Sequence, residues 1–124
     1  MEMKNTVHTN EYALITGATG GLGRAFVYAV AKRGYSLLLT ARSAEKLQAL
    51  QRELQEKYPE IPTRIYAADL SDADSRIAMT EKIAAENIRI SLLANVAGAD
   101  IQKPLREYTQ EKIAFQCRVN FESA

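Results

Sequence analysis

The sequence predicts an α/β fold, a doubly wound parallel sheet with helices on both faces. Short apolar runs alternate with amphipathic helical patterns four times along the chain, which is typical of successive strand–helix units. A glycine-rich turn directly follows the first apolar run, and 124 residues with 47% hydrophobic and 25% charged side chains suit one globular domain. With right-handed connections we expect four βα units in one parallel sheet, in the strand order 3-2-1-4 that is common in doubly wound sheets.

The composition excludes several classes of function. Net charge is +1 with acidic and basic residues interspersed, so no basic stripe indicates nucleic acid and no polybasic patch indicates a membrane surface. The single cysteine, Cys117, rules out an internal disulfide and favours a cytoplasmic location. No apolar stretch is long enough for a signal peptide or a membrane span. We expect a flexible arm over residues 1–10, one domain over 11–124 and no metal site.

The first unit combines a strand over residues 12–16 with a helix that begins near Leu22. Lys32 and Arg33 suit the last turn of this helix, and Gly34 ends it. Apolar residues recur at helical spacing, and the predicted inward face consists of Leu22, Ala25, Phe26, Ala29 and Val30.

The second unit has a continuous apolar strand over residues 36–40, as expected for a strand that is covered on both faces. Ser43 is placed to cap the helix that follows, and Pro59 and Pro62 end it. The apolar stripe of this helix is predicted to contain Leu47, Leu50, Leu54 and Tyr58.

The third and fourth units repeat this arrangement. A strand over 63–68 leads through the turn 69–72 into a helix whose inward residues are predicted to be Ala73, Ile77, Thr80 and Ala84. A strand over 90–95 is followed by a helix that Thr109 can cap. The inward face of that last helix is predicted to contain Ile113, Cys117, Asn120 and Phe121.

The turn over residues 16–23 reads Thr-Gly-Ala-Thr-Gly-Gly-Leu-Gly and joins the first strand to the first helix. Glycines let the main chain approach a ligand closely, and a helix N-terminus offers free N–H groups and a positive dipole end to an anion. This context predicts a phosphate site, in preference to a turn without a ligand. No Lys-Ser/Thr pair follows Gly23, which disfavours a loop that binds a triphosphate with magnesium.

A basic residue follows the second strand, at the edge of the sheet where a dinucleotide places its adenosine ribose. Folds that select NAD carry an acidic residue there, whereas this chain has Arg42 and Ser43. Arg42 can form a forked contact with a 2′-phosphate, and Ser43 can donate an auxiliary hydrogen bond. The pair predicts about a ten- to hundredfold preference for NADP(H). The alternative is a solvated arginine at the start of a helix.

Gly17, Gly21 and Gly23 form a TGxxxGxG pattern that resembles the coenzyme loop of the short-chain dehydrogenase/reductase family. The resemblance implies a Rossmann-like half-fold over most of the chain. Asn95-Val96-Ala97-Gly98 resembles the family's NNAG segment, with Val96 in place of the second Asn and with Asn95 expected to be buried. With Arg42 and Ser43 from the second strand and the motifs of the family, the predicted cofactor site consists of Gly17, Thr19, Gly20, Gly21, Leu22, Gly23, Arg42, Ser43, Asp69, Leu70, Asn95, Ala97 and Gly98.

Two polar residues acquire roles from the same resemblance. In the family, an Asp at the position of Asp69 accepts a hydrogen bond from the adenine amino group, and the backbone N–H of the next residue, Leu70, meets the ring. The alternative for Asp69 is a turn residue that bonds backbone donors. Asn120 resembles the Asn that bonds the active-site lysine through water and completes the catalytic tetrad. The alternative for Asn120 is an amide at a helix or dimer interface.

The catalytic Ser, Tyr and Lys of this family lie beyond the segment that the chain resembles. Two Tyr-x-x-x-Lys spacings are present, beginning at Tyr28 and at Tyr108, and we interpret both as solvated pairs on helices. His8 lies in the polar arm and is no substitute base. We therefore expect little or no turnover from these 124 residues.

The favoured hypothesis is the coenzyme-binding half of an NADP(H)-dependent oxidoreductase that acts on small-molecule carbonyl or alcohol compounds. The alternatives are a non-catalytic dinucleotide-binding module and a structural fragment that binds nothing. In the family that the chain resembles, later strands cover the fourth strand and the fourth helix packs in a dimer. The resemblance therefore implies an open edge at the fourth strand and an exposed apolar face on the fourth helix, so we expect a homo-oligomer that binds neither nucleic acid nor membrane.

Overall fold

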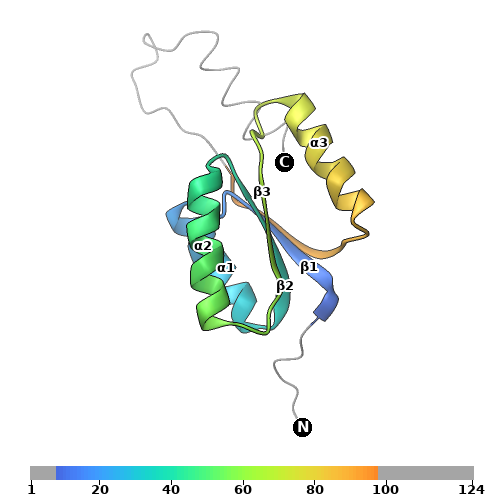
Figure 1. Cartoon of the computed structure of the whole chain (residues 1–124). Helices are drawn as coiled ribbons and strands as arrows, with labels where there is room; N and C mark the ends of the chain where they lie inside the picture. The colour runs from blue at the N-terminus through green and yellow to red at the C-terminus, as the bar shows by residue number, and fades with distance from the viewer. Residues whose placement is uncertain (1–7, 98–124) are drawn as a thin grey trace, which may run out of the picture.

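The computed structural model describes residues 8–97, with side chains from residue 11 onward. The predicted fourth helix lies outside the described residues, as do two predicted site residues, Gly98 and Asn120. Strands and helices alternate along the chain (Figure 1). In order they are β1 His8–Thr16, α1 Gly21–Lys32, β2 Tyr35–Ala41, α2 Ala44–Lys57, β3 Thr63–Ala67, α3 Ala73–Ala85 and β4 Arg89–Asn95.

The four strands form one parallel sheet in the order β3-β2-β1-β4, which confirms the predicted topology. Helices α1 and α2 lie on one face of the sheet and α3 lies on the other (Figure 1). Thr16 at the end of β1 pairs with Thr40 of β2 and with Asn95 of β4. The carboxyl ends of three strands therefore meet at one edge of the sheet.

The first strand is longer than predicted. β1 begins at His8, so residues 8–10 of the predicted arm belong to the sheet. His8 pairs with Tyr35 of β2, and Glu11 pairs with Arg89 of β4. Backbone pairing with the neighbouring strands extends β1 past its apolar run. The hydrophobic pattern of the sequence does not predict this extension, because backbone pairing does not require apolar side chains.

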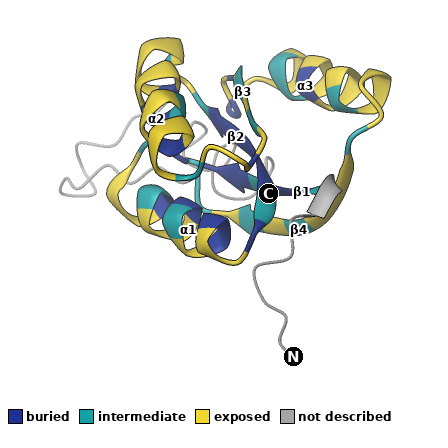
Figure 2. Ribbon diagram, turned by 60° about the horizontal axis from the view of Figure 1, so that its bottom comes forward, coloured by how far each residue is buried: buried dark blue, intermediate teal, exposed yellow. Residues whose placement is uncertain are grey.

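The main core lies between the sheet and helices α1 and α2. Leu47, Leu50 and Leu54 of α2 are fully buried, as their spacing predicts, and Ser43 caps the helix by accepting a hydrogen bond from the Lys46 N–H at 3.2 Å. Figure 2 shows that the buried parts of α1 and α2 face the strands and that their outer surfaces are exposed. The strands contribute Ala13, Ile15, Leu37 and Leu39 to this core.

The predicted inward face of α1 is wrong at four of its five positions. Ala25 and Ala29 are exposed, and the exposed fractions of Leu22 and Phe26 are 65% and 43%. Val30 is buried as predicted, and the residues that share its face are Gly23, Val27 and Ala31. Gly23 decides the rotation of the helix, because a Cβ there would overlap the Gly17 carbonyl oxygen. The side of the helix that carries Gly23 therefore faces the turn.

The predicted face of α3 is also wrong, since Ala73, Ile77, Thr80 and Ala84 are all exposed. Met79 is buried against Ala68 and Leu70, and Ile83 packs beside it. The Arg76 guanidinium donates a hydrogen bond of 2.6 Å to the Leu70 carbonyl. That bond holds the first turn of α3 against the loop before it, so Met79 and Ile83 face the sheet.

Candidate functional site

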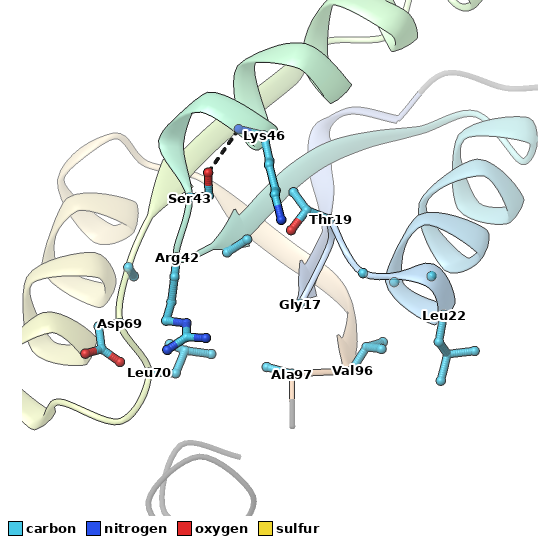
Figure 3. Close-up of a pocket in the computed structure, with 15 residues that line it drawn as sticks. Gly17, Thr19, Leu22, Arg42, Ser43, Lys46, Asp69, Leu70, Val96 and Ala97 are labelled. Atoms are coloured by element: carbon cyan, nitrogen blue, oxygen red, sulfur yellow. Dashed lines mark hydrogen bonds between the residues drawn. The ribbon is translucent and has the colours of Figure 1, made fainter. Parts of the chain in front are cut away.

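A cavity of about 480 Å³ opens at the carboxyl ends of the strands, between the glycine turn, the start of α2 and the loop after β3 (Figure 3). Most residues of the predicted cofactor site line it. These are Gly17, Thr19, Gly20, Gly21, Leu22, Gly23, Arg42, Ser43, Asp69, Leu70 and Ala97. Four further residues line the cavity that the predicted cofactor site does not include, namely Ala41, Lys46, Ala68 and Val96.

Asn95 is the predicted residue that the structure places differently. Its side chain is exposed, which corrects the expectation of a buried amide, and it is not among the residues that line the cavity. Val96, the departure from the NNAG pattern, lines the cavity and also packs against the main core. Side chains alternate between the two faces of β4, and this alternation turns Asn95 away from the core that contacts Val96.

The glycine turn is shaped by close backbone contacts. Gly17 has a φ of +64°, and a Cβ there would lie 2.8 Å from the Ala97 nitrogen. A Cβ at Gly23 would overlap the Gly17 carbonyl oxygen, so the first turn of α1 rests directly on the end of β1. These two glycines are therefore required by the fold itself, with or without a ligand.

Gly21 differs from Gly17 and Gly23 because a Cβ built on it would meet no atom within 4 Å. The space beside it belongs to the cavity. Gly20, the N-cap of α1, offers no side-chain cap, and the first turn of α1 contains no acidic residue. Ser43 and Asp72, by contrast, cap α2 and α3. The N-terminus of α1 thus presents N–H groups and a positive dipole end to a cavity that an anion can enter.

Two hydrogen bonds hold the floor of the cavity. The Ala18 N–H donates to the Thr40 carbonyl at 3.2 Å, which joins the turn to β2. The Ala97 N–H donates to the Thr16 hydroxyl at 3.0 Å, which joins the second residue after β4 to the end of β1. The strand ends that surround the glycine turn are therefore fixed to one another before any ligand binds.

Cationic side chains border the cavity where β2 passes into α2. Arg42 is exposed and extends toward Leu70 and Asp69, whereas Lys46 extends from the first turn of α2 toward Thr19 (Figure 3). Ser43 lies between them in sequence, and its hydroxyl already accepts the cap bond from Lys46. Two positive charges beside a helix N-terminus make this corner suitable for a phosphate group.

Asp69 organises the loop that leads into α3. One of its carboxylate oxygens, Oδ1, accepts hydrogen bonds from the Ser71 N–H at 3.0 Å and from the Ser71 hydroxyl at 2.6 Å. The Asp69 N–H donates to the Ser75 hydroxyl at 2.9 Å. The alternative role of Asp69 as a turn residue therefore has direct support, and the same turn brings Asp69 and Leu70 to the cavity wall.

Tyr28 contacts the neighbouring helix and lies away from the cavity. Its hydroxyl donates a hydrogen bond of 2.7 Å to Glu53, and the Arg24 guanidinium donates to the same carboxylate oxygen at 2.9 Å. Burial and the bond to Glu53 raise the pKa of Tyr28 above its ordinary value. A proton-transferring phenol needs the opposite shift, so Tyr28 is a packing residue between α1 and α2.

No group of three or more His, Cys, Asp or Glu side chains is arranged to hold a metal ion within residues 8–97. None of the helices in the same range is long and apolar enough to cross a membrane.

The parallel sheet, its glycine turn and the uncapped helix at the carboxyl edge define a nucleotide-binding domain of the Rossmann type. The family model described as short chain dehydrogenase matches residues 11–124, so the chain belongs to the short-chain dehydrogenase family.

The chain is similar to curated members of this family in nematodes and plants. It is 35% identical over 94 residues to a very-long-chain 3-oxoacyl-CoA reductase of Caenorhabditis elegans. The aligned region covers 75% of this chain and 29% of the relative. It is 36% identical over 113 residues to a tropinone reductase homolog of Arabidopsis thaliana. The aligned region covers 90% of this chain and 41% of the relative. The chain therefore spans less than half the length of these relatives.

Solved structures of the same fold agree with this assignment. A short-chain dehydrogenase from Sphingobium yanoikuyae in complex with NADPH superposes with a TM-score of 0.83 at 29% identity, over 91% of this chain and 44% of that one. L-sorbose reductase from Gluconobacter frateurii, complexed with NADPH and L-sorbose, gives a TM-score of 0.85 at 26% identity, over 94% of this chain and 44% of that one.

Proposed function

We propose that the chain is the NADP(H)-binding half of an oxidoreductase that transfers hydride between the nicotinamide and a carbonyl or alcohol carbon of a small molecule. The observation that carries this proposal is the cavity itself, where an uncapped glycine turn and the cationic residue Arg42 border one space. The similar proteins whose structures contain NADPH support the choice of cofactor.

Different residues of the cavity would bind the diphosphate, the 2′-phosphate and the adenine of NADP(H). The N–H groups at the start of α1 would hold the diphosphate, with Gly21 leaving room for its oxygens. Arg42 would bind the 2′-phosphate with a charge-assisted contact, helped by the Ser43 hydroxyl as a donor. Asp69 and the backbone of Leu70 would hold the adenine.

The end of β4 would border the nicotinamide half of the site. Ala97 lies against Gly17, and the small side chain of Ala97 leaves the cofactor room to approach. We assign Gly98 to the same border, whereas Asn95 has no role in it because its exposed side chain does not line the cavity. We assign Asn120 to the positioning of a catalytic lysine. The bound cofactor supplies the hydride, and this chain binds and orients the cofactor.

Calorimetry with NADPH and NADH tests the proposal. We expect the wild-type chain to bind NADPH about ten to a hundred times more tightly than NADH. Arg42→Asp should reduce or reverse that ratio, because a carboxylate repels the 2′-phosphate and accepts from a free 2′-hydroxyl. A wild-type chain that binds neither nucleotide, or an unchanged ratio in Arg42→Asp, would overturn the proposal.

The proposed function also includes the turnover, the assembly and the cellular location of the protein. We propose that these 124 residues alone reduce substrate slowly or not at all, so NADPH-dependent reduction by the purified chain would contradict this part. We further propose a cytoplasmic homo-oligomer, consistent with the exposed apolar side chains Leu93 and Phe26 and with a single cysteine in the chain.

A further inference from the structure

Lys46 lines the cavity, yet none of the sequence motifs includes it. It is the third residue of α2, and its backbone N–H is held by the Ser43 hydroxyl at 3.2 Å. The helix cap therefore fixes the position from which the side chain extends. In Figure 3 that side chain extends from α2 toward Thr19 of the glycine turn.

The charge of Lys46 is unfavourable for the helix that carries it. A cation in the first turn opposes the helix dipole, whereas the other lysine of α2 near a helix end, Lys57, lies in the last turn, where the dipole favours it. In α3 the charges follow the favourable order, with Asp74 in the first turn and Lys82 in the last. The position of Lys46 therefore needs a reason other than the stability of α2.

An ion pair within the protein does not supply that reason. Among the described residues, Lys46 forms no ion pair, whereas Arg24 on the neighbouring helix pairs with Glu53 at 2.9 Å. The side chains that line the cavity include two cations, Arg42 and Lys46, and one carboxylate, Asp69. The corner of the cavity at the start of α2 therefore has an excess of positive charge.

We propose that Lys46 is a second residue that selects NADP(H), binding the 2′-phosphate from the side of the glycine turn while Arg42 binds it from the side of Leu70. The inference rests on the proposed function and adds a specificity residue to it. A phosphomonoester carries between one and two negative charges at neutral pH, so two cations neutralise it better than one. A lysine ammonium, with three donors on a flexible stem, can follow the phosphate without fixed geometry.

The main competing role for Lys46 is a contact with the diphosphate, which NADH and NADPH share. The two roles give different results, because loss of a 2′-phosphate contact weakens NADPH alone, whereas loss of a diphosphate contact weakens both nucleotides equally. The comparison of the two nucleotides therefore distinguishes them without any measurement of turnover.

The test is calorimetry of the full chain with NADPH, NADH, 2′-phospho-AMP and AMP. For Lys46→Gln we expect the Kd of NADPH and of 2′-phospho-AMP to rise about tenfold and the Kd of NADH and of AMP to stay unchanged. Glutamine keeps a similar helix propensity, so α2 should persist. Lys46→Arg keeps the charge and should keep most of the preference for NADPH.

Lys32→Gln is the matched control, because it removes one exposed positive charge from the last turn of α1, at the opposite end of that helix from the glycine turn. It should leave all four affinities unchanged. Equal weakening of NADPH and NADH in Lys46→Gln, or no change in either, would overturn the role of Lys46 while the proposed function stands. A wild-type chain that fails to bind NADPH would overturn both.

Discussion

The hydroxyl of Thr16 accepts a hydrogen bond of 3.0 Å from the backbone N–H of Ala97, 81 residues further along the chain. This bond joins β1 to the second residue after β4, beside the turn where Gly17 faces Ala97. Thr40, the register partner of Thr16 on β2, is fully buried, and its hydroxyl has no hydrogen-bond partner among the described residues. Among the described residues, the Thr16 hydroxyl therefore has a hydrogen-bond partner, and the Thr40 hydroxyl in the neighbouring strand has none.

Replacing each threonine by valine measures that difference. We expect Thr16→Val to lower the free energy of unfolding by about 0.5–1.5 kcal/mol, because the part-buried Ala97 N–H loses its acceptor. Thr40→Val removes a hydroxyl that has no partner, so the free energy of unfolding should stay equal or rise. Urea denaturation of the two variants beside the wild type provides the measurement. Equal destabilisation by both would contradict the assigned bond.

The glycines of the turn separate a requirement of the fold from a requirement of the ligand. We expect Gly21→Ala to fold with unchanged or slightly higher thermal stability, because the new Cβ meets no protein atom and alanine favours a helix. Its affinity for NADPH should fall at least about tenfold, because the methyl group occupies the space proposed for the diphosphate.

Gly23→Ala is the matched comparison for that variant. Its Cβ would overlap the Gly17 carbonyl oxygen, so we expect loss of the cooperative thermal transition. Circular dichroism and calorimetry together report both properties. Undiminished NADPH binding by a folded Gly21→Ala variant would remove the diphosphate from this turn.

The elements of this fold follow from local signals, and the rotation of two helices does not. Ser43, the glycine turn and the leucine stripe of α2 are each specified within a few residues, so their positions agree with the structure. The first helix is apolar over much of its surface, and hydrophobic spacing alone selected the side that contains Leu22 and Phe26. Gly23 sets the actual side through a contact with residue 17 that depends on the folded turn.

The candidate site shows the same division between local and tertiary signals. Arg42 was found because its place after β2 has a chemical meaning in nucleotide folds. Lys46 was missed because a single lysine on a helix surface is usually solvated, and only the folded cavity shows that it reaches toward Thr19. The exposure of Asn95 likewise depends on which face of β4 each residue occupies.

Glu53 makes the stability of the chain depend on pH. Hydrogen bonds from Arg24 and then from Tyr28 lower the pKa of Glu53 below its ordinary value of 4.5. A carboxylate with a lowered pKa in the folded state contributes stability above the unfolded pKa and loses it as pH falls through the folded pKa. We therefore expect wild type to be more stable than Glu53→Gln at neutral pH, with the gap smaller at about pH 3.

Thermal unfolding of both proteins across this pH range measures the gap. Glu86→Gln is a useful second variant, because Lys82 and then Arg64 hold the pKa of Glu86 below its ordinary value in the same way, far from the contact between α1 and α2. High salt should narrow the gap for both, since these pairs are partly exposed. A gap for Glu53→Gln that is constant from acid to neutral pH would contradict the pairing.

The β4 edge of the sheet formed by residues 8–97 is the surface from which we expect self-association. β4 is an edge strand of the described sheet, and Leu93 on it is 54% exposed. Unpaired backbone groups beside exposed apolar side chains favour pairing with a second chain. Leu93→Lys should therefore shift the sedimentation profile toward the monomer.

Ile77→Lys on α3 is the control. Ile77 is equally exposed at 53%, but it lies on a helix, which offers no strand edge to a second chain. A strictly monomeric wild type, or equal effects of the two substitutions, would exclude β4 as the interface.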